Sequence, residues 1–263
     1  MIENKKEFKL IAKKNPKSLL PNALTIFGVC LGLSSIKFAL DTNYAMSVVA
    51  IGFAAILDTL DGRVARLIKG TSKVGKELDS LTDVISFGVA PGFIMYFWAL
   101  NEIGKFGWMF VLIYTVCCAL RLARFNLTTI EENESWKINF FEGVPSPAGA
   151  GLVLLPLILS LSDLVQFENF AILSSITILT TSILMVSKLP TYSLKRILIP
   201  RHLTIFLLLG IGIYVSLLIF YTFETLFFTG IAYFVLIPIS YFHYNHKSKT
   251  LLAINEEETE DVL

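Results

Sequence analysis

The sequence predicts an all-α integral membrane protein, a bundle of about eight transmembrane helices with both termini on the cytoplasmic side. The first observation is the composition: of 263 residues, 54% are hydrophobic and only 16% are charged, and the mean hydropathy is +0.68. A soluble domain of this length would need a more polar surface. The other two observations are the length of the apolar runs and the positions of the basic residues between them.

About eight apolar runs, of roughly 18–23 residues each, are long enough to cross about 30 Å of hydrocarbon as helices. Helices are expected because every backbone N–H and C=O group must be satisfied within the lipid. The runs lie near residues 22–40, 44–66, 78–100, 106–126, 146–162, 168–187, 203–221 and 225–243, and the fifth is the shortest.

The basic residues predict the orientation of these runs. Twenty of the 22 Lys and Arg residues lie in the two tails or in alternate connections with their flanking turns, which leaves Lys37 and Lys105 for the other side. By the positive-inside rule, both termini face the cytoplasm and the helix count is even. The sequence therefore predicts a protein of the cytoplasmic (inner) membrane.

One transmembrane domain, residues 21–245, is expected between two polar tails. Residues 1–20 contain six lysines, and we expect either a basic interfacial segment or a disordered basic tail. Residues 246–263 are acidic and are expected to be disordered. The net charge of +1 gives no basis for binding nucleic acid.

Four aspartates stand at the inner ends of the second and third runs: Asp58, Asp61, Asp79 and Asp83. At the bilayer centre each would cost about 2.5–3.5 kcal/mol, and less near the interface. Divalent cations are the expected compensation, because hard metal ions bind carboxylate oxygens. Helical spacing puts the first two aspartates on one face of the second run and the last two on one face of the third. A metal site that faces the cytoplasm between these two helices is therefore predicted.

Small residues adjoin the aspartates and leave space where the second and third predicted helices meet. Gly62, Ala65 and Gly75 would let a flat or charged ligand approach the backbone, although such spacing also occurs in ordinary helix packing. Arg66 is placed either to bind a phosphate or to extend its charge to the interface. The residues alone leave both alternatives open.

The pattern D-x2-D-G-x2-A-R-x8-G-x3-D-x3-D, from Asp58 to Asp83, resembles the signature of the CDP-alcohol phosphotransferase family. The resemblance implies that Asp58, Asp61 and Asp79 bind one or two Mg²⁺ or Mn²⁺ ions. It implies that Asp83 is both a metal ligand and the general base. Homodimers are also common in that family, so a homodimer is an expectation by resemblance alone.

The same resemblance implies a site for the CDP group, with contacts from Asn22, Thr25, Gly62, Arg66, Ser72 and Gly75. Asn22 and Thr25 begin the first run, where a helix N-terminus favours anions. An ordinary helix cap at Asn22 and an ordinary loop serine at Ser72 are the alternatives.

Three further stretches resemble the bacterial branch of the family that uses serine: residues 79–91 (DSLTDVISFGVAP), 121–126 (RLARFN) and 141–151 (FEGVPSPAGAG). The implied reaction transfers the phosphatidyl group of CDP-diacylglycerol to the hydroxyl of L-serine and gives phosphatidylserine and CMP. Arg121, Arg124 and Asn126 are the candidate serine contacts, since arginine suits a carboxylate. The alternative for the two arginines is interfacial anchoring.

Two other functions would also use a cluster of aspartates or the same family reaction. Another acceptor alcohol, glycerol 3-phosphate or an inositol compound, would keep the reaction and change the product. A divalent-cation transporter would need carboxylates along a path across the membrane. Here the aspartates gather at one level and the other runs contain almost no acidic residues, which disfavours transport.

Overall fold

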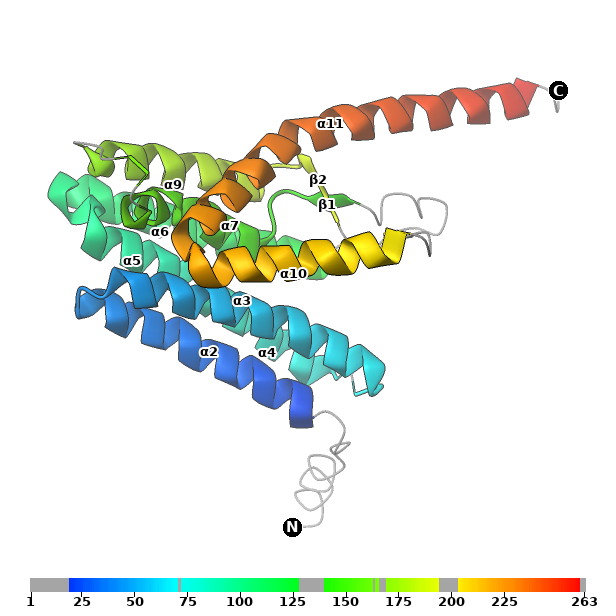
Figure 1. Ribbon diagram of the computed structural model, residues 1–263. Coiled ribbons are helices and arrows are strands. Elements are labelled where there is room, and N and C mark those ends of the chain that lie inside the picture. The colour runs from blue at the N-terminus through cyan, green and yellow to red at the C-terminus, as the bar shows by residue number, and fades with distance from the viewer. Residues whose placement is uncertain are drawn as a thin grey trace, which may run out of the picture.

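The computed structural model describes residues 19–70, 72–127, 140–162, 164–165, 169–193 and 203–260. These residues form a bundle of helices with one two-stranded ribbon (Figure 1). The predicted all-α class is therefore confirmed. The basic segment expected at residues 1–20 lies almost entirely outside the described residues.

The first two helices, α2 (Leu19–Leu40) and α3 (Tyr44–Leu67), form an antiparallel hairpin. At the end of the turn between them, Asn43 caps the start of α3: its side chain accepts a hydrogen bond from the backbone N–H of Met46 at 3.2 Å. An asparagine at this position satisfies one of the N–H groups that a helix start leaves unpaired. The short turn keeps α2 and α3 side by side as far as the opposite end, where the aspartates of α3 lie.

The third predicted run is a helix in three parts: α4 (Lys73–Asp83), a π-helix (Val84–Val89) and α5 (Ala90–Trp98). The sequence predicts one regular helix here, because hydropathy does not distinguish a π turn from an α turn. A π turn is wider than an α turn and often occurs beside functional residues. This one begins directly after Asp83, so it lies next to the predicted catalytic residue.

Side chains from α6 (Lys105–Leu127) form hydrogen bonds with backbone carbonyl groups of the π-helix. The Tyr114 hydroxyl donates to the carbonyl of Phe87 at 2.6 Å, and the Thr115 hydroxyl donates to the carbonyl of Gly88 at 3.3 Å. A short 3₁₀ turn, Leu100–Ile103, joins α5 to α6. Polar groups on α6 therefore hold the irregular backbone in place within an apolar bundle.

The fifth predicted run is divided into α7 (Ser146–Val153) and α8 (Leu155–Leu161). Pro156 explains the break, since proline has no N–H to continue the helical hydrogen bonds and disfavours a helical residue before it. The next helix, α9 (Phe170–Val186), packs against α6 and α7.

Two short strands, β1 (Phe140–Glu142) and β2 (Pro190–Tyr192), pair antiparallel with Phe140 opposite Tyr192. The chain continues as α10 (Thr204–Phe220) and α11 (Thr222–Glu260), which extends beyond the bundle (Figure 1). Residues 246–260, expected to be disordered, are thus the last part of a helix. Its final stretch is rich in glutamate, a good helix former, which explains the difference.

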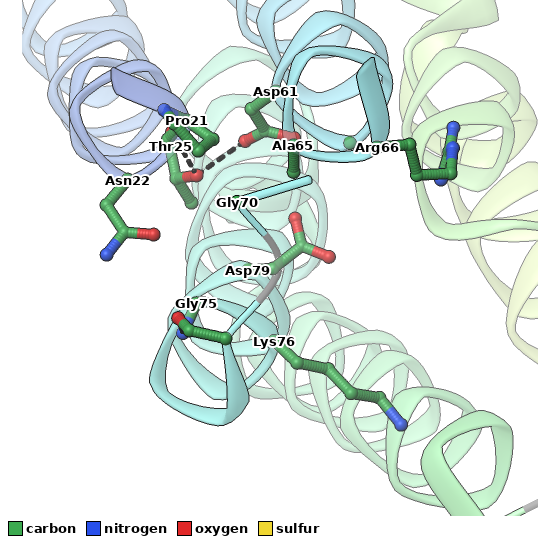
Figure 2. Close-up of a pocket in the computed structure, with 12 residues that line it drawn as sticks. Pro21, Asn22, Thr25, Asp61, Ala65, Arg66, Gly70, Gly75, Lys76 and Asp79 are labelled. Carbon is green, nitrogen blue, oxygen red and sulfur yellow. Dashed lines mark hydrogen bonds between the residues drawn. The ribbon is translucent and has the colours of Figure 1, made fainter. Parts of the chain in front are cut away.

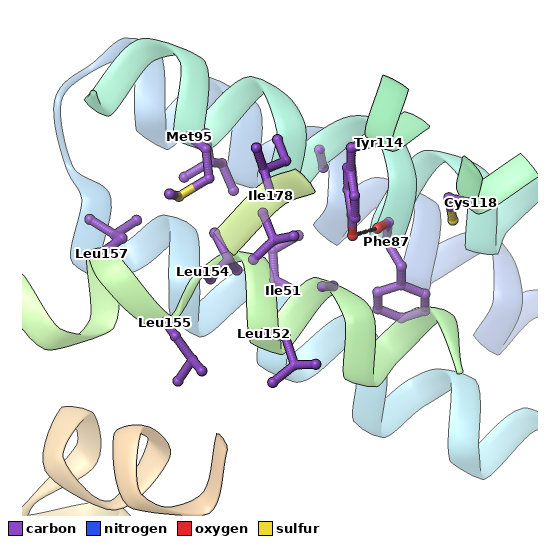
Figure 3. Packing of buried hydrophobic residues seen from close by; sticks show 14 of the residues in the cluster. Ile51, Phe87, Met95, Tyr114, Cys118, Leu152, Leu154, Leu155, Leu157 and Ile178 are labelled. Atoms are coloured by element: carbon purple, nitrogen blue, oxygen red, sulfur yellow. Dashed lines mark hydrogen bonds between the residues drawn. The ribbon is translucent and has the colours of Figure 1, made fainter. Parts of the chain in front are cut away.

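The bundle core lies among α3, the π segment and helices α5 to α9, where Phe87, Met95, Tyr114 and Ile178 are fully buried (Figure 3). Within the described residues, five helical stretches are long and apolar enough to cross a membrane: Leu19–Leu40, Tyr44–Leu67, Val74–Trp98, Lys105–Leu127 and Thr222–Asn245. Two shorter apolar helices, α9 and α10, accompany them. The structure supports an all-α membrane protein, whereas the count of eight spans stays a prediction.

Candidate functional site

The four aspartates lie on two adjacent helices: Asp58 and Asp61 on α3, and Asp79 and Asp83 on α4. A loop of five residues between α3 and α4 brings the two pairs together. One carboxylate oxygen from each of Asp58, Asp61 and Asp79 lies within 4.8 Å of the other two. In the described part of the chain, no lysine or arginine forms an ion pair with any of the four.

This arrangement fits a divalent cation. Three carboxylates at this separation repel one another, and oxygen donors are what hard cations bind. Asp61 is 4% exposed, so water screens its charge poorly. The chemistry of the donor set, and the lack of cations paired with it among the described residues, are both what a metal site requires.

Asp83 is not part of this group of three, although its carboxyl group adjoins that of Asp58. Its Oδ2 atom accepts a hydrogen bond from the hydroxyl of Ser146 at 3.1 Å. Its Oδ1 atom is buried and has no hydrogen-bond partner. Asp83 therefore presents one engaged and one free carboxylate oxygen at the edge of the metal-binding group.

A cavity of about 500 Å³ opens beside the aspartates (Figure 2). It is lined by Pro21, Asn22, Thr25, Asp61, Gly62, Ala65, Arg66, Gly70, Ser72, Gly75, Lys76 and Asp79. All six residues predicted to contact CDP are in that set. Residues that are more than fifty positions apart in the sequence thus line one cavity, which also contains two of the predicted metal ligands.

Hydrogen bonds fix the wall of this cavity. The Thr25 hydroxyl lies 2.6 Å from Asp61 Oδ2, to which it donates, and 3.0 Å from the carbonyl oxygen of Pro21 (Figure 2). Ser72 caps α4, since its hydroxyl accepts from the backbone N–H of Gly75 at 2.9 Å. A hydroxyl that accepts a bond still has its own hydrogen to donate. The start of α4 therefore offers the hydroxyl hydrogen of Ser72, and the positive end of a helix dipole, to an anion in the cavity.

Gly75 lies where a larger residue would displace neighbouring side chains. A Cβ atom at this position would lie 2.9 Å from Asn22 Oδ1 and 3.0 Å from Ser72 Oγ, closer than ordinary van der Waals contact. The missing side chain thus allows α2 and the start of α4 to approach each other at the cavity.

The three predicted serine contacts differ in their surroundings. Arg121 is 6% exposed, and its Nη1 atom donates to the hydroxyl of Ser146 at 3.0 Å. Arg124 donates to the carbonyl oxygens of Val186 at 2.7 Å and Ser187 at 3.1 Å, at the end of α9. Arg121 is therefore a buried arginine near Asp83, whereas Arg124 joins α6 to the end of α9.

The third candidate, Asn126, donates from Nδ2 to the hydroxyl of Ser80 at 2.8 Å, and so joins the end of α6 to α4. Through Ser146, Arg121 is linked by hydrogen bonds between described residues to Asp83, one of the four aspartates. Its Nε atom is buried and has no partner. Interfacial anchoring, the alternative for Arg121, does not fit a guanidinium this deeply buried.

Sequence reasoning missed Ser146 and Lys76. Lys76 lines the cavity from the first turn of α4. Its place three residues before Asp79, on the helix face that carries the aspartates, was a usable signal. Ser146 lies within the stretch FEGVPSPAGAG, but its link to Asp83 is a contact between residues 63 positions apart and has no local signal.

Known proteins and family models match most of the chain. The family model for CDP-alcohol phosphatidyltransferase matches residues 18–191, and the model described as CDP-alcohol phosphatidyltransferase 2 matches residues 202–238. Similar curated proteins from Mycobacterium leprae, Mycobacterium bovis and Bacillus subtilis are each named CDP-diacylglycerol–serine O-phosphatidyltransferase.

The extent of these likenesses varies. The M. leprae protein is 39% identical over 70% of this chain, and the match spans 61% of its own length. The M. bovis protein is 35% identical over 84% of this chain and 78% of its own length. The B. subtilis protein is 36% identical over 67% of this chain and 92% of its own length.

Proposed function

The chain belongs to the CDP-alcohol phosphatidyltransferase family, and from this membership we propose that it transfers the phosphatidyl group of CDP-diacylglycerol to L-serine, giving phosphatidylserine and CMP. The observation that carries the proposal is the cavity beside the aspartates, which contains all six expected nucleotide contacts and two of the expected metal ligands. The names of the similar proteins support serine as the acceptor.

In this proposal the CDP group occupies the cavity between α2, α3 and α4. Its phosphates lie at the start of α4, where the Ser72 hydroxyl, nearby N–H groups and the Lys76 ammonium offer donors and positive charge. Arg66 supplies a second cation from α3. Asn22, Thr25, Gly62 and Gly75 complete the wall around the nucleotide.

Asp58, Asp61 and Asp79 hold the metal, with Asp83 as a further ligand beside Asp58. We take the metal to be one or two Mg²⁺ or Mn²⁺ ions, which the all-oxygen donor set suits. When bound, such ions supply charge neutralisation for the pyrophosphate and for the CMP that leaves. The hydroxyl of Thr25 orients the Asp61 carboxylate for this role.

Asp83 is the general base. Its Oδ1 accepts the proton of the serine hydroxyl, and the hydroxyl oxygen forms a bond to the phosphorus that carries diacylglycerol. The bond from that phosphorus to the bridging oxygen breaks, and CMP leaves with that oxygen. The free, buried Oδ1 atom supports this assignment, since a buried acceptor without a partner is costly unless a ligand uses it.

Arg121 binds the serine carboxylate. A buried guanidinium with an unpaired Nε–H calls for an anion, and arginine binds carboxylates in a two-pronged geometry. Arg124 and Asn126 form the edge of the same site on α6. Their contacts to α9 and α4 keep the end of α6 in place.

The finer topology is also part of the proposal. Eight spans with both termini in the cytoplasm require α7 with α8, α9 and α10 to cross in addition to the five long stretches. The aspartates then lie on the cytoplasmic side of the inner membrane. Serine and CMP are dissolved in the cytoplasm, while the acyl chains stay in lipid. The homodimer stays a prediction from resemblance.

The test is acceptor choice by the purified protein. Labelled CDP-diacylglycerol is incubated in detergent with Mn²⁺ or Mg²⁺ and with L-serine, glycerol 3-phosphate or inositol in separate reactions. We expect a lipid product with serine alone. Product from glycerol 3-phosphate or inositol, and none from serine, would keep the family reaction and reject the acceptor.

A further inference from the structure

Ser146 stands between the two charged groups of the proposed acceptor site. It is fully buried at the first residue of α7, 3.1 Å from Asp83 Oδ2 and 3.0 Å from Arg121 Nη1. Neither sequence reasoning nor the comparisons give it a role. Its hydroxyl is the one side-chain group that, among the described residues, hydrogen-bonds to both Asp83 and Arg121.

The chemistry of the three groups fixes the direction of these bonds. A guanidinium only donates, and an ionised carboxylate only accepts. Ser146 therefore accepts a hydrogen bond from Arg121 and gives its single hydrogen to Asp83. This ordered chain engages Oδ2 of Asp83 and leaves Oδ1 unpartnered, just as it engages Nη1 of Arg121 and leaves Nε unpartnered.

The backbone holds Ser146 in this place. Pro145 precedes it with φ −61° and ψ 148°, and Pro147 follows within the first turn of α7, so the flanking rings restrict the chain. Gly143, three residues before Ser146, has φ 74°, and a Cβ atom there would lie 2.6 Å from the carbonyl oxygen of Met185. The segment before α7 is thus seated tightly on the end of α9, with little freedom to carry Ser146 elsewhere.

The two hydrogen bonds, of 3.0 and 3.1 Å, mean that Arg121 Nη1 and Asp83 Oδ2 are at most about 6 Å apart. A direct ion pair would bring these two atoms to about 2.8 Å, and the two charged groups would then bind each other instead of the acceptor. With the hydroxyl between them, the cation and the base stay close but separate. A small acceptor that has a carboxylate near its hydroxyl can then contact both groups at once.

We infer that Ser146 is a positioning residue, which turns Oδ1 of Asp83 toward the acceptor hydroxyl and keeps Arg121 from pairing directly with the base. The inference rests on the proposed function, since it assigns Ser146 to the acceptor side of that reaction. Each carboxylate oxygen has two acceptor positions, so Oδ2 can accept from Ser146 and still contact a cation. Ser146 is not among the residues that line the proposed nucleotide cavity.

Ser146→Ala removes the hydroxyl and lets Arg121 and Asp83 close on each other. A misplaced base costs up to about a hundredfold in rate, so we expect kcat to fall about tenfold to a hundredfold. The KM for serine should rise several-fold, because the carboxylate site loses its cation to Asp83. The KM for CDP-diacylglycerol and the Kd for CDP should stay within about twofold, because the nucleotide cavity is not touched.

Two further variants separate positioning from folding. Ser146→Thr keeps a hydroxyl and should recover most of the kcat lost in Ser146→Ala. Ser146→Cys keeps the shape with a weak donor and should give a kcat between those of Ser146→Ala and the parent chain. Ser182→Ala is the matched control: this equally buried serine on α9 donates only to the carbonyl of Ile178 at 2.7 Å, and we expect unchanged kinetics.

The outcomes are distinct. Ser146→Ala and Ser146→Cys both with the parent kcat would overturn the inference and leave the proposed function standing. A loss of CDP affinity in proportion to kcat would also overturn it, because Ser146 would then support the scaffold as a whole. If the parent chain itself forms no phosphatidylserine, the proposed function fails and the inference falls with it.

Discussion

Replacing Gly75 by alanine tests whether the cavity between α2 and α4 binds the nucleotide. The new Cβ atom would lie 2.9 Å from Asn22 Oδ1 and 3.0 Å from Ser72 Oγ, so both side chains must move by a few tenths of an ångström. In the proposed complex, losing a hydrogen bond from Asn22 to the nucleotide costs about 1 kcal/mol, and losing one from the Ser72 hydroxyl to a phosphate costs about the same. The sum, about 2 kcal/mol, corresponds to roughly thirtyfold in affinity.

The assay is isothermal titration of CDP into the detergent-solubilised protein with Mn²⁺, followed by the KM for CDP-diacylglycerol. Gly52→Ala is the control, because a Cβ atom there, on the same hairpin, has no neighbour within 4 Å. We expect Gly75→Ala to bind CDP roughly thirtyfold more weakly and Gly52→Ala to bind as the parent does. Equal CDP affinity in all three chains would refute the placement of the nucleotide beside α4.

Three further substitutions test single side chains. Asp83→Asn should abolish phosphatidylserine formation while CDP binding, measured by titration, persists; residual activity within tenfold of the parent would exclude Asp83 as the base. Arg121→Lys should raise the KM for serine at least tenfold and leave the KM for CDP-diacylglycerol unchanged, because an ammonium cannot bind a carboxylate in two-pronged fashion; equal KM values for serine would argue against a carboxylate site there. Arg124→Ala should lower Tm by about 3–6 °C in a thermal scan, since it loses its bonds to the end of α9; an unchanged Tm with a raised KM for serine would make it a direct acceptor contact.

The sequence was most informative where function depends on short-range spacing. Asp58 and Asp61 are three residues apart, as one helix face requires, and the short connection to α4 limits where Asp79 can lie. Close packing of α2 against α3 and α4 then brings Asn22 and Thr25 to the same cavity. Helix spacing was enough to predict that the aspartates share one site, whereas Asn22 and Thr25 were predicted from the resemblance to the family.

Prediction was weaker where tertiary contacts decide the structure. The π-helix after Asp83 depends on Tyr114 and Thr115 of another helix, which hydropathy cannot detect. The break of the fifth run had a visible signal in Pro156, which a hydropathy pattern does not take into account. The link from Arg121 through Ser146 to Asp83 joins three separate elements, so only the folded chain reveals it.

The measurement that tests the central claim most directly is the stoichiometry of products from the purified chain, CDP-diacylglycerol and L-serine, with Mn²⁺ or with excess EDTA. We predict equal molar amounts of CMP and phosphatidylserine with the metal, no release of either without serine, and loss of both with EDTA. CMP release at the same rate without serine, or without phosphatidylserine formation, would contradict transfer to serine at the aspartate site.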